Sequence, residues 1–239
     1  MKSTFLAIFL LVNASLQAQN FGLSFSYFIP KNGYFSTPIS PFSIRGLGFD
    51  LNKFLAIETG ASLYRMAGLN MKDLPFESKQ PLVGPNFTIF VPLELVIQLK
   101  ASKVGLDLKG GIFGFHGFGQ KINYGNLDRA IRTYHGWNVA NGNFSFDNKP
   151  GWGYHGGAEL TIYVTPQVGV SLESNYLVGE SKFPLQGTYT GGGPDPLQTI
   201  TTTNEFENAK IDFTGFEFSI GIIFDTGGKA PKKMKRRRR

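Results

Sequence analysis

Apolar side chains recur at every second position in several stretches of this chain, the pattern of a β-strand with one apolar and one polar face. In the stretch 87–98, six large apolar residues alternate with a second face that contains Thr88, Glu94 and Gln98. Eight strands with alternation of this kind, less regular in the second, third and fifth, are predicted near 21–27, 42–51, 54–66, 87–98, 103–115, 157–164, 168–178 and 216–224. The chain is therefore predicted to be an all-β protein.

The connections between these strands are predicted to alternate in length. Short turns fall at 50–53, 99–103 and 165–167, and long connections fall at about 29–41, 67–86, 116–151 and 180–209. Short periplasmic turns and long extracellular loops are typical of a transmembrane barrel, and an even strand number puts both chain ends on the short-turn side. The predicted fold is an eight-stranded antiparallel up-and-down transmembrane β-barrel. Periodicity alone leaves open a soluble barrel with the two faces reversed.

The two faces differ in residue size as well as polarity. The polar face is rich in glycine, serine and threonine, which suit the narrow, side-chain-filled interior of an eight-stranded barrel, whereas leucine, valine, isoleucine and phenylalanine suit lipid. Aromatic residues near strand ends predict two interfacial girdles. The long-loop girdle would hold Tyr27, Phe28, Tyr64, Phe87, Phe113, Phe115, Trp152, Tyr154 and Phe213, and the short-turn girdle Phe21, Phe54, Tyr163 and Phe224.

Charged residues on the polar face are mostly acidic. The side chains predicted to lie inside the barrel are Glu58, Glu94, Asp107, Lys109, Glu159, Glu173 and Glu217, with Arg45 as a further counter-charge. Buried carboxylates need cationic or hydrogen-bonding partners. We therefore expect a polar network that fills the barrel, and a proton or ion path through it is the alternative.

Two of the long connections contain turn signals of their own. The stretch "WNVANGNFSF" has Asn141-Gly142 between alternating segments, a strong hairpin signal. The stretch "GTYTGGGPDPLQTITTT" has turn residues at 191–196. We expect two ribbons that stand above the membrane, and mobile loops are the alternative.

Composition divides the chain into three parts. Lys2, the apolar run 5–12 and the small residues up to Ala18 predict a signal peptide over 1–18. Cleavage after Ala14 and a buried N-terminal strand or helix are the alternatives. The barrel is then assigned to 19–225 and a basic tail to 226–239. The chain has no cysteine, so a disulfide framework and a lipoprotein anchor are both excluded.

The formal net charge of +7 is concentrated at the C-terminal end. Removing the eight basic residues of the tail and Lys2 from the 24 leaves 15 basic residues against 17 acidic ones, so nucleic-acid binding by the folded body has no support. The tail is predicted to face the periplasm and to bind a periplasmic protein, peptidoglycan or anionic lipid. Its predicted binding residues are Lys229, Lys232, Lys233, Lys235, Arg236, Arg237, Arg238 and Arg239.

Candidate catalytic chemistry is sparse. His155 and Glu159 are four residues apart on the same predicted face, whereas His116 and His135 belong to the third long connection. Phosphate-loop and nucleophile-elbow motifs are both absent, as is cysteine-based metal spacing. We therefore expect a protein that is not an enzyme, without a metal or other cofactor. An enzyme site at the barrel rim built on His155 and Glu159 remains the alternative.

Several segments taken together resemble a known family. They are "FVPLELVIQ", "VGLDLKGGIFGF", "GGAELTIYVTPQVGVSLESNYLVGE" and a last strand with Phe216, Phe218, Ile220, Ile222 and Phe224. Over about 20–224 the chain resembles the porin-family outer-membrane β-barrel domain, with its OmpA-like eight-stranded barrels. The resemblance implies a bacterial outer-membrane location, contact with membrane lipid and a last strand that acts as the assembly signal. Such strands usually end the chain, whereas Phe224 precedes Arg239 by fifteen residues.

The function expected from these observations is that of a structural or interaction protein. The barrel would display loops outside the cell and a basic tail inside the periplasm, and analogy with some family members suggests an accessory subunit of a secretion or assembly complex. A narrow porin-like channel is one alternative, and the rim enzyme is the second.

Overall fold

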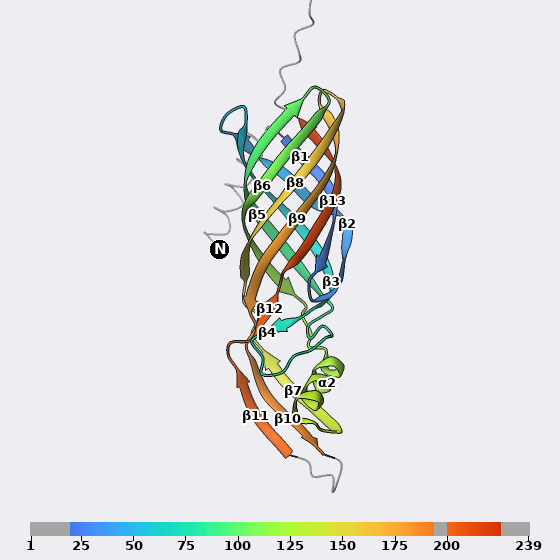
Figure 1. Cartoon of the computed structure of the whole chain (residues 1–239), viewed down its shortest axis with the longest axis vertical. Coiled ribbons are helices and arrows are strands. Elements are labelled where there is room, and N and C mark those ends of the chain that lie inside the picture. The colour runs from blue at the N-terminus through green and yellow to red at the C-terminus, as the bar shows by residue number, and fades with distance from the viewer. Residues whose placement is uncertain (1–19, 194–199, 226–239) are drawn as a thin grey trace, which may run out of the picture.

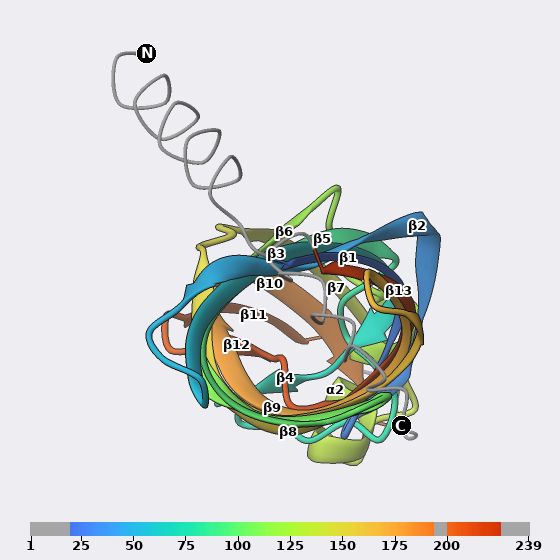
Figure 2. The same ribbon diagram turned by 90° about the horizontal axis from the view of Figure 1, so that it is seen from above.

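The computed structural model describes residues 20–193 and 200–225, so the predicted signal peptide and basic tail lie outside the described residues. The barrel strands are β1 (Asn20–Pro30), β2 (Gly33–Asp50), β3 (Leu55–Leu69), β5 (Asn86–Ala101), β6 (Val104–Phe118), β8 (Gly151–Thr165), β9 (Val168–Lys182) and β13 (Gly215–Asp225). Each pairs antiparallel with the next, and β13 pairs with both β9 and β1, which closes the ring (Figures 1 and 2). The predicted eight-stranded antiparallel barrel is confirmed.

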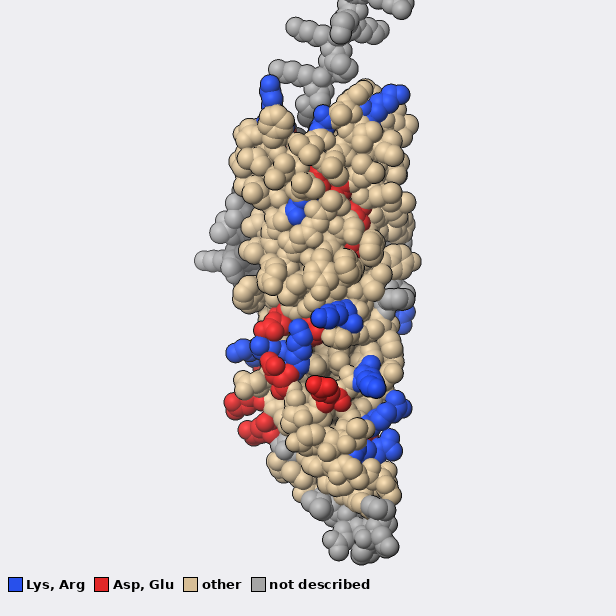
Figure 3. Space-filling view, in the orientation of Figure 1, with Lys and Arg blue, Asp and Glu red and all other residues tan. Residues whose placement is uncertain are grey.

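The barrel is apolar outside and polar inside. On β5 the alternation is regular: Leu93 is 52% exposed, whereas its neighbour Glu94 is 2% exposed. Figure 3 shows a broad band of the outer wall that is tan apart from a few small red and blue patches. A soluble barrel would bury these apolar side chains, so the alternative with reversed faces is wrong. A closed barrel also leaves no strand edge with unpaired backbone groups, as a hydrocarbon environment requires.

The three predicted short turns all lie at one end of the barrel. They are residues 51–54, 102–103 and 166–167, and the outer ends of β1 and β13 lie there too, paired as Asn20 with Asp225. We call this the short-turn end, and the opposite end the loop end. Long connections at the loop end run over 70–85, 119–150 and 183–214, as predicted.

The prediction of a long connection over 29–41 is wrong. β1 and β2 are joined by the two residues Lys31 and Asn32, and β2 extends from Gly33. Prolines at 38 and 41 interrupt the alternation there, which hides the strand in the sequence. Among the described pairs, Pro38 lies opposite Tyr64 of β3, whereas the pairs of β2 with β1 lie between Ser43 and Leu47. A proline lacks the backbone N–H and cannot donate a ladder hydrogen bond. It is therefore tolerated where a strand has a partner on one side only.

The long connections form an ordered module beyond the loop end. β7 (Val139–Phe146), β10 (Leu185–Gly192) and β11 (Ile200–Phe206) make a three-stranded antiparallel sheet in the order β11-β10-β7, and helix α2 (Tyr124–His135) packs on β7 (Figure 1). We call these four elements the loop module. Two short strands, β4 (Met71–Lys72) and β12 (Lys210–Asp212), pair with each other, and β12 also pairs with the last three residues of β9.

The hairpin predicted around Asn141-Gly142 is wrong. Both residues lie inside β7, opposite Thr190 and Tyr189 of β10. The Gly142 N–H donates a 2.8 Å hydrogen bond to Asp128 Oδ1 on α2 instead of forming a turn. The second predicted ribbon is confirmed as the β10–β11 hairpin, and its turn at 194–199 lies outside the described residues.

Helix α2 was not predicted, although its signals are present in the sequence. The Asn123 side chain caps its first turn by accepting a hydrogen bond from the Asn126 N–H, and Gly136 ends it in the left-handed conformation with φ 68°. Leu127, Ala130 and Ile131 share one face and are buried. The described residues contain no helix that is both long and apolar enough to cross a membrane.

Ile131→Ala should loosen α2 from the sheet without affecting the barrel. Ile131 is fully buried in the module core, and removing such a side chain costs ~2–4 kcal/mol. We expect faster proteolysis within 119–150 in the folded protein. Barrel closure, read as the gel-mobility change on heating, should not change. The exposed Arg129→Ala on the same helix is the matched control, and equal proteolysis of both variants would contradict the packing described here.

Candidate functional site

Lys109 of β6 is the centre of a charged network inside the barrel. Its Nζ lies 2.5 Å from Glu159 Oε2, 3.3 Å from Glu173 Oε1 and 3.9 Å from Glu58 Oε2. These four side chains come from four strands, and all are buried. The alternation of each strand turns the charges inward, and the small bore brings them within reach of one ammonium group.

A second cation, Arg45 of β2, extends the network around the wall. Its Nη2 pairs with Glu217 Oε1, which also accepts a hydrogen bond from the Tyr64 hydroxyl. The Asn175 amide donates to Glu217 Oε2 at 2.9 Å and to Glu173 Oε1 at 3.0 Å, and so connects the two cations. Buried ion pairs contribute little net stability, but loss of one partner leaves a charge without compensation.

Glu94 and Asp107 lie at the margins of this network. Glu94 Oε1 is 3.6 Å from His155 Nε2, beyond hydrogen-bond distance. Asp107 is half-buried and lines a small cavity of about 20 Å³ near the short-turn end, together with Glu58, Glu159 and Arg45. The structure therefore brings all seven predicted interior residues into the lumen, mainly toward the short-turn end.

An aromatic layer fills the lumen on the loop side of these charges. We call it the aromatic plug, and it consists of six buried rings, those of Phe28, Tyr64, Phe90, Phe113, Phe115 and Phe213. Phe213, from the segment between β12 and β13, stacks on Phe28 and Phe115 with centroids 4.4 Å from each. The Arg45 guanidinium lies 5.8 Å from the Phe90 centroid, so charge network and plug are in contact.

The prediction of the long-loop girdle is correct for only four of its nine residues. Tyr27, Phe87, Trp152 and Tyr154 point outward and are exposed, as a girdle requires. Phe28, Tyr64, Phe113, Phe115 and Phe213 are instead buried in the plug. Position near a strand end does not decide which face a residue occupies. Strand parity does, because Phe113 and Phe115 alternate in step with the inward Lys109, and this signal was available in the sequence.

The short-turn girdle is also only partly formed. Phe54 is exposed at its turn, and Phe21 stacks on Phe224 with a centroid distance of 4.9 Å across the β1–β13 seam. Phe216, Phe218, Ile220 and Ile222 of the predicted assembly signal are exposed on the outer wall. Tyr163 lines the lumen mouth instead of the outer wall.

The candidate catalytic residues are not arranged as a pair. His155 and Glu159 both lie inside the barrel, but Glu159 binds Lys109, and His155 lies between Glu94 and the rings of Phe90 and Phe113. His135 is in the loop module, where it stacks on Trp137 and its Nε2 lies 2.8 Å from the Tyr189 hydroxyl. In the described part of the chain, no three or more His, Cys, Asp or Glu side chains form a group that could hold a metal ion.

Polar contacts hold the loop module together and fix the short strand β12 at the barrel rim. Partial burial raises the pKa of Asp128, while the hydrogen bond from Gly142 lowers it. On β12, Lys210 Nζ lies 2.7 Å from Glu180 and 3.3 Å from Asp73, and these hydrogen bonds raise the pKa of the lysine. The first contact joins α2 to β7 within the loop module, and the second joins β12 to β9 and Asp73 at the barrel rim.

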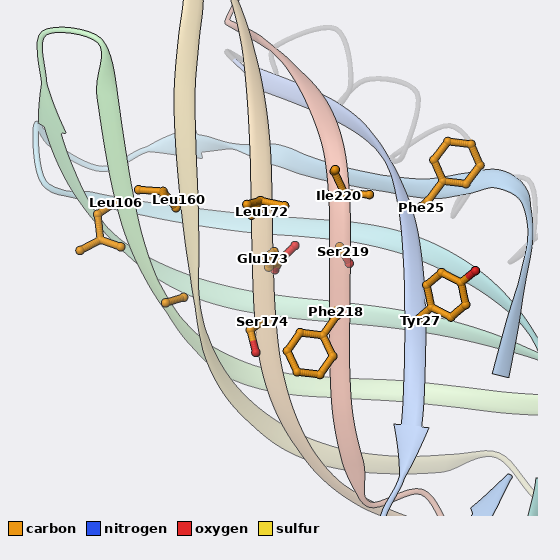
Figure 4. Close-up of a pocket in the computed structure, with 11 residues that line it drawn as sticks. Phe25, Tyr27, Leu106, Leu160, Leu172, Glu173, Ser174, Phe218, Ser219 and Ile220 are labelled. Carbon is orange, nitrogen blue, oxygen red and sulfur yellow. The ribbon is translucent and has the colours of Figure 1, made fainter. Parts of the chain in front are cut away.

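A hollow of about 430 Å³ lies on the outer wall rather than in the lumen. Figure 4 shows the side chains from β1, β6, β8, β9 and β13 that line it, among them Tyr27, Leu172 and Phe218. Its lining is almost entirely apolar, like the rest of the outer wall.

No protein-family model matches the chain, and no curated protein matches it. Among solved structures, the chain is similar to the outer membrane protein OprG from Pseudomonas aeruginosa, with 12% identity, a TM-score of 0.47, and coverage of 87% of this chain and 95% of that one. It is also similar to Ail, the attachment invasion locus protein of Yersinia pestis, with 11% identity, a TM-score of 0.37, and coverage of 86% and 94%. A major outer membrane protein from Thermus thermophilus has 13% identity, a TM-score of 0.39, and coverage of 86% and 98%. The function of this chain is inferred from its own residues.

Lys109→Met should destabilise the barrel by about 3–5 kcal/mol, because three carboxylates lose the cation that they share. The measurement is urea unfolding in detergent micelles. Lys53→Met, at an exposed residue of the 51–54 turn, is the control and should change the unfolding free energy by less than about 0.5 kcal/mol.

Adding Glu159→Gln to Lys109→Met should recover part of the lost stability, since one unpaired charge is removed. Wild-type stability of Lys109→Met would mean that the network does not hold the barrel together.

Proposed function

We propose that this chain is a bacterial outer-membrane barrel with a closed lumen, which acts as a structural and interaction protein and not as a channel. The aromatic plug carries this proposal. Its six buried rings pack against one another at the loop side of the lumen, and the ion pairs of Lys109 and Arg45 fill the space below. A solute would have to displace both layers. The apolar outer wall supports placement in a membrane.

In the proposed orientation, the short-turn end faces the periplasm and the loop module faces the cell exterior, as in other barrels of this architecture. The loop module supports a role in binding, because it has its own buried core and presents a sheet and a helix beyond the membrane. Binding residues on such projections are held in place by the scaffold beneath them. A partner outside the cell would therefore bind to the folded surface of the loop module.

The basic tail is proposed to bind an anionic partner in the periplasm. Eight basic residues follow Asp225, which ends β13 at the short-turn end. Each contributes on the order of 1 kcal/mol near an anionic surface, within a Debye length of roughly 8–10 Å. Peptidoglycan, anionic lipid and an acidic subunit of a secretion or assembly complex all fit this chemistry. The signal peptide over 1–18 is the proposed export route.

Single-channel recording in planar bilayers tests the closed lumen. We expect no steady openings from the wild-type barrel, and small, lasting openings from a variant that combines Phe90→Ala and Phe213→Ala, which remove two central rings of the plug, with Lys109→Ala and Glu159→Ala, which remove one ion pair of the layer below. Phe218→Ala, on the outer wall, is the matched control and should stay closed. Steady conductance of the wild type would overturn the proposal in favour of the narrow channel. Gel mobility before and after heating verifies that each variant forms a barrel.

Deletion of residues 229–239 tests the tail. We expect the barrel to assemble, because its strands end at Asp225, and we expect a salt-sensitive association to weaken. The measurement is co-purification from outer membranes at low and high ionic strength, with a full-length variant whose eight basic residues are glutamine as the control for chain length. Unchanged co-purification at low salt would remove the tail from the proposal and leave the closed barrel in place.

A further inference from the structure

A cleft of about 310 Å³ crosses the rim of the barrel at the short-turn end. It lies between the β5–β6 turn, the β8–β9 turn and the end of β13, and its lining residues include Lys100, Lys103, Val104, Tyr163 and Val164, with Asp225 at its end. In Figure 3 the charged side chains visible at this end of the barrel are basic. We refer to it as the rim cleft.

The walls of the rim cleft are fixed by backbone hydrogen bonds. The Tyr163 N–H donates to the Lys103 carbonyl at 2.8 Å, and the Asp225 N–H donates to the Gln167 carbonyl at 2.9 Å. The Thr165 hydroxyl oxygen accepts hydrogen bonds from the backbone of the β8–β9 turn, including one of 3.0 Å from Val168. The cleft is therefore part of the folded rim and does not depend on a ligand for its shape.

The charges of the cleft favour an anion. Lys103 is exposed and makes no ion pair with any described residue. Lys100 Nζ lies 3.8 Å from Asp225 Oδ2, near the limit for an ion pair, and its side chain is 40% exposed. Lys100 also lines the adjoining small cavity, together with Asp107 and Glu159, so its side chain borders both the acidic lumen and the cleft. An anion is accordingly placed on the outer side of the two ammonium groups, away from these carboxylates.

The outer lip of the same cleft is apolar. Val164 is 72% exposed and Val104 is 43% exposed, and both continue the apolar outer wall toward Ile162 and Leu106. An anionic head beside an apolar chain, within one cleft at a membrane boundary, matches a phospholipid and does not match a soluble anion. The positions of the lysines at the end of the apolar wall are those of interfacial basic residues.

We propose that the rim cleft binds an anionic phospholipid, with its phosphate between Lys100 and Lys103 and an acyl chain over Val104 and Val164. This inference rests on the membrane placement in the proposed function. It is independent of the closed lumen and of the tail. It adds a defined lipid site to a barrel whose other lipid contacts are those of a general apolar wall.

Native mass spectrometry of the full mature chain, titrated with phosphatidylglycerol in detergent, tests the site. Each lysine near an anionic headgroup contributes about 1 kcal/mol, which corresponds to about five-fold in affinity. We expect Lys100→Gln with Lys103→Gln to weaken the first bound lipid about twenty-five-fold, by the same constants. Lys100→Arg with Lys103→Arg should retain it. The tail is present in every variant, so differences between variants report the cleft alone.

Lys53→Gln is the matched control, because Lys53 is exposed on the 51–54 turn at the same end and does not line the cleft. It should weaken binding less than two-fold. An equal loss in Lys53→Gln would overturn the proposal, since it would mean only diffuse attraction to the rim. Competition with soluble glycerol phosphate separates the two sources of phosphate. Displacement of the lipid by it would overturn the assignment to a phospholipid, and failure to displace supports it.

Discussion

The pairing of the first strand with the last is the contact on which the rest of the structure depends. All of β1, from Asn20 to Pro30, pairs residue for residue with β13, from Asp225 to Gly215. Without it the sheet would expose two long edges of unpaired backbone groups, which hydrocarbon cannot satisfy. Closure at eight strands also fixes a narrow bore, so every inward side chain must pack or pair with another. The charge network and the aromatic plug are the two ways in which this chain meets that requirement.

The charge network and the aromatic plug follow one another along the barrel axis, so one end of the lumen is charged and the other is aromatic. Charged groups around Lys109 lie toward the short-turn mouth, where the small cavity with Asp107 is found. The rings around Phe213 lie toward the loops, and Phe213 itself belongs to the segment that leads from the loop module into β13. The plug is thus continuous with the module core, in which Phe144, Tyr189 and Ile131 are buried. At the loop end, the side chains in the lumen and those of the loop module therefore form one hydrophobic core.

Alternation along the strands was sufficient to predict the barrel, its faces and its interior charges, because a period of two is a local property. Glu94 and Leu93 needed no tertiary information to be placed inside and outside. The failures have different physical causes. Asn141-Gly142 has turn chemistry, but pairing with β10 and the bond to Asp128 outweigh it. The aromatic residues near strand ends were assigned by depth alone, although parity already placed Phe113 and Phe115 inside. Helix α2 was hidden in a connection treated as loop.

The buried core of the loop module has a consequence for how the protein reaches its final state. Both described ends of the barrel, Asn20 and Asp225, lie on one side, whereas α2, β7, β10 and β11 lie on the other. In the proposed orientation these segments must cross the bilayer as the barrel forms. A three-stranded sheet with a docked helix is too wide for a bore filled by side chains. The module therefore crosses as extended chain and folds afterwards, so its apolar residues, Ile131 and Phe144 among them, are exposed for a time at the outer surface.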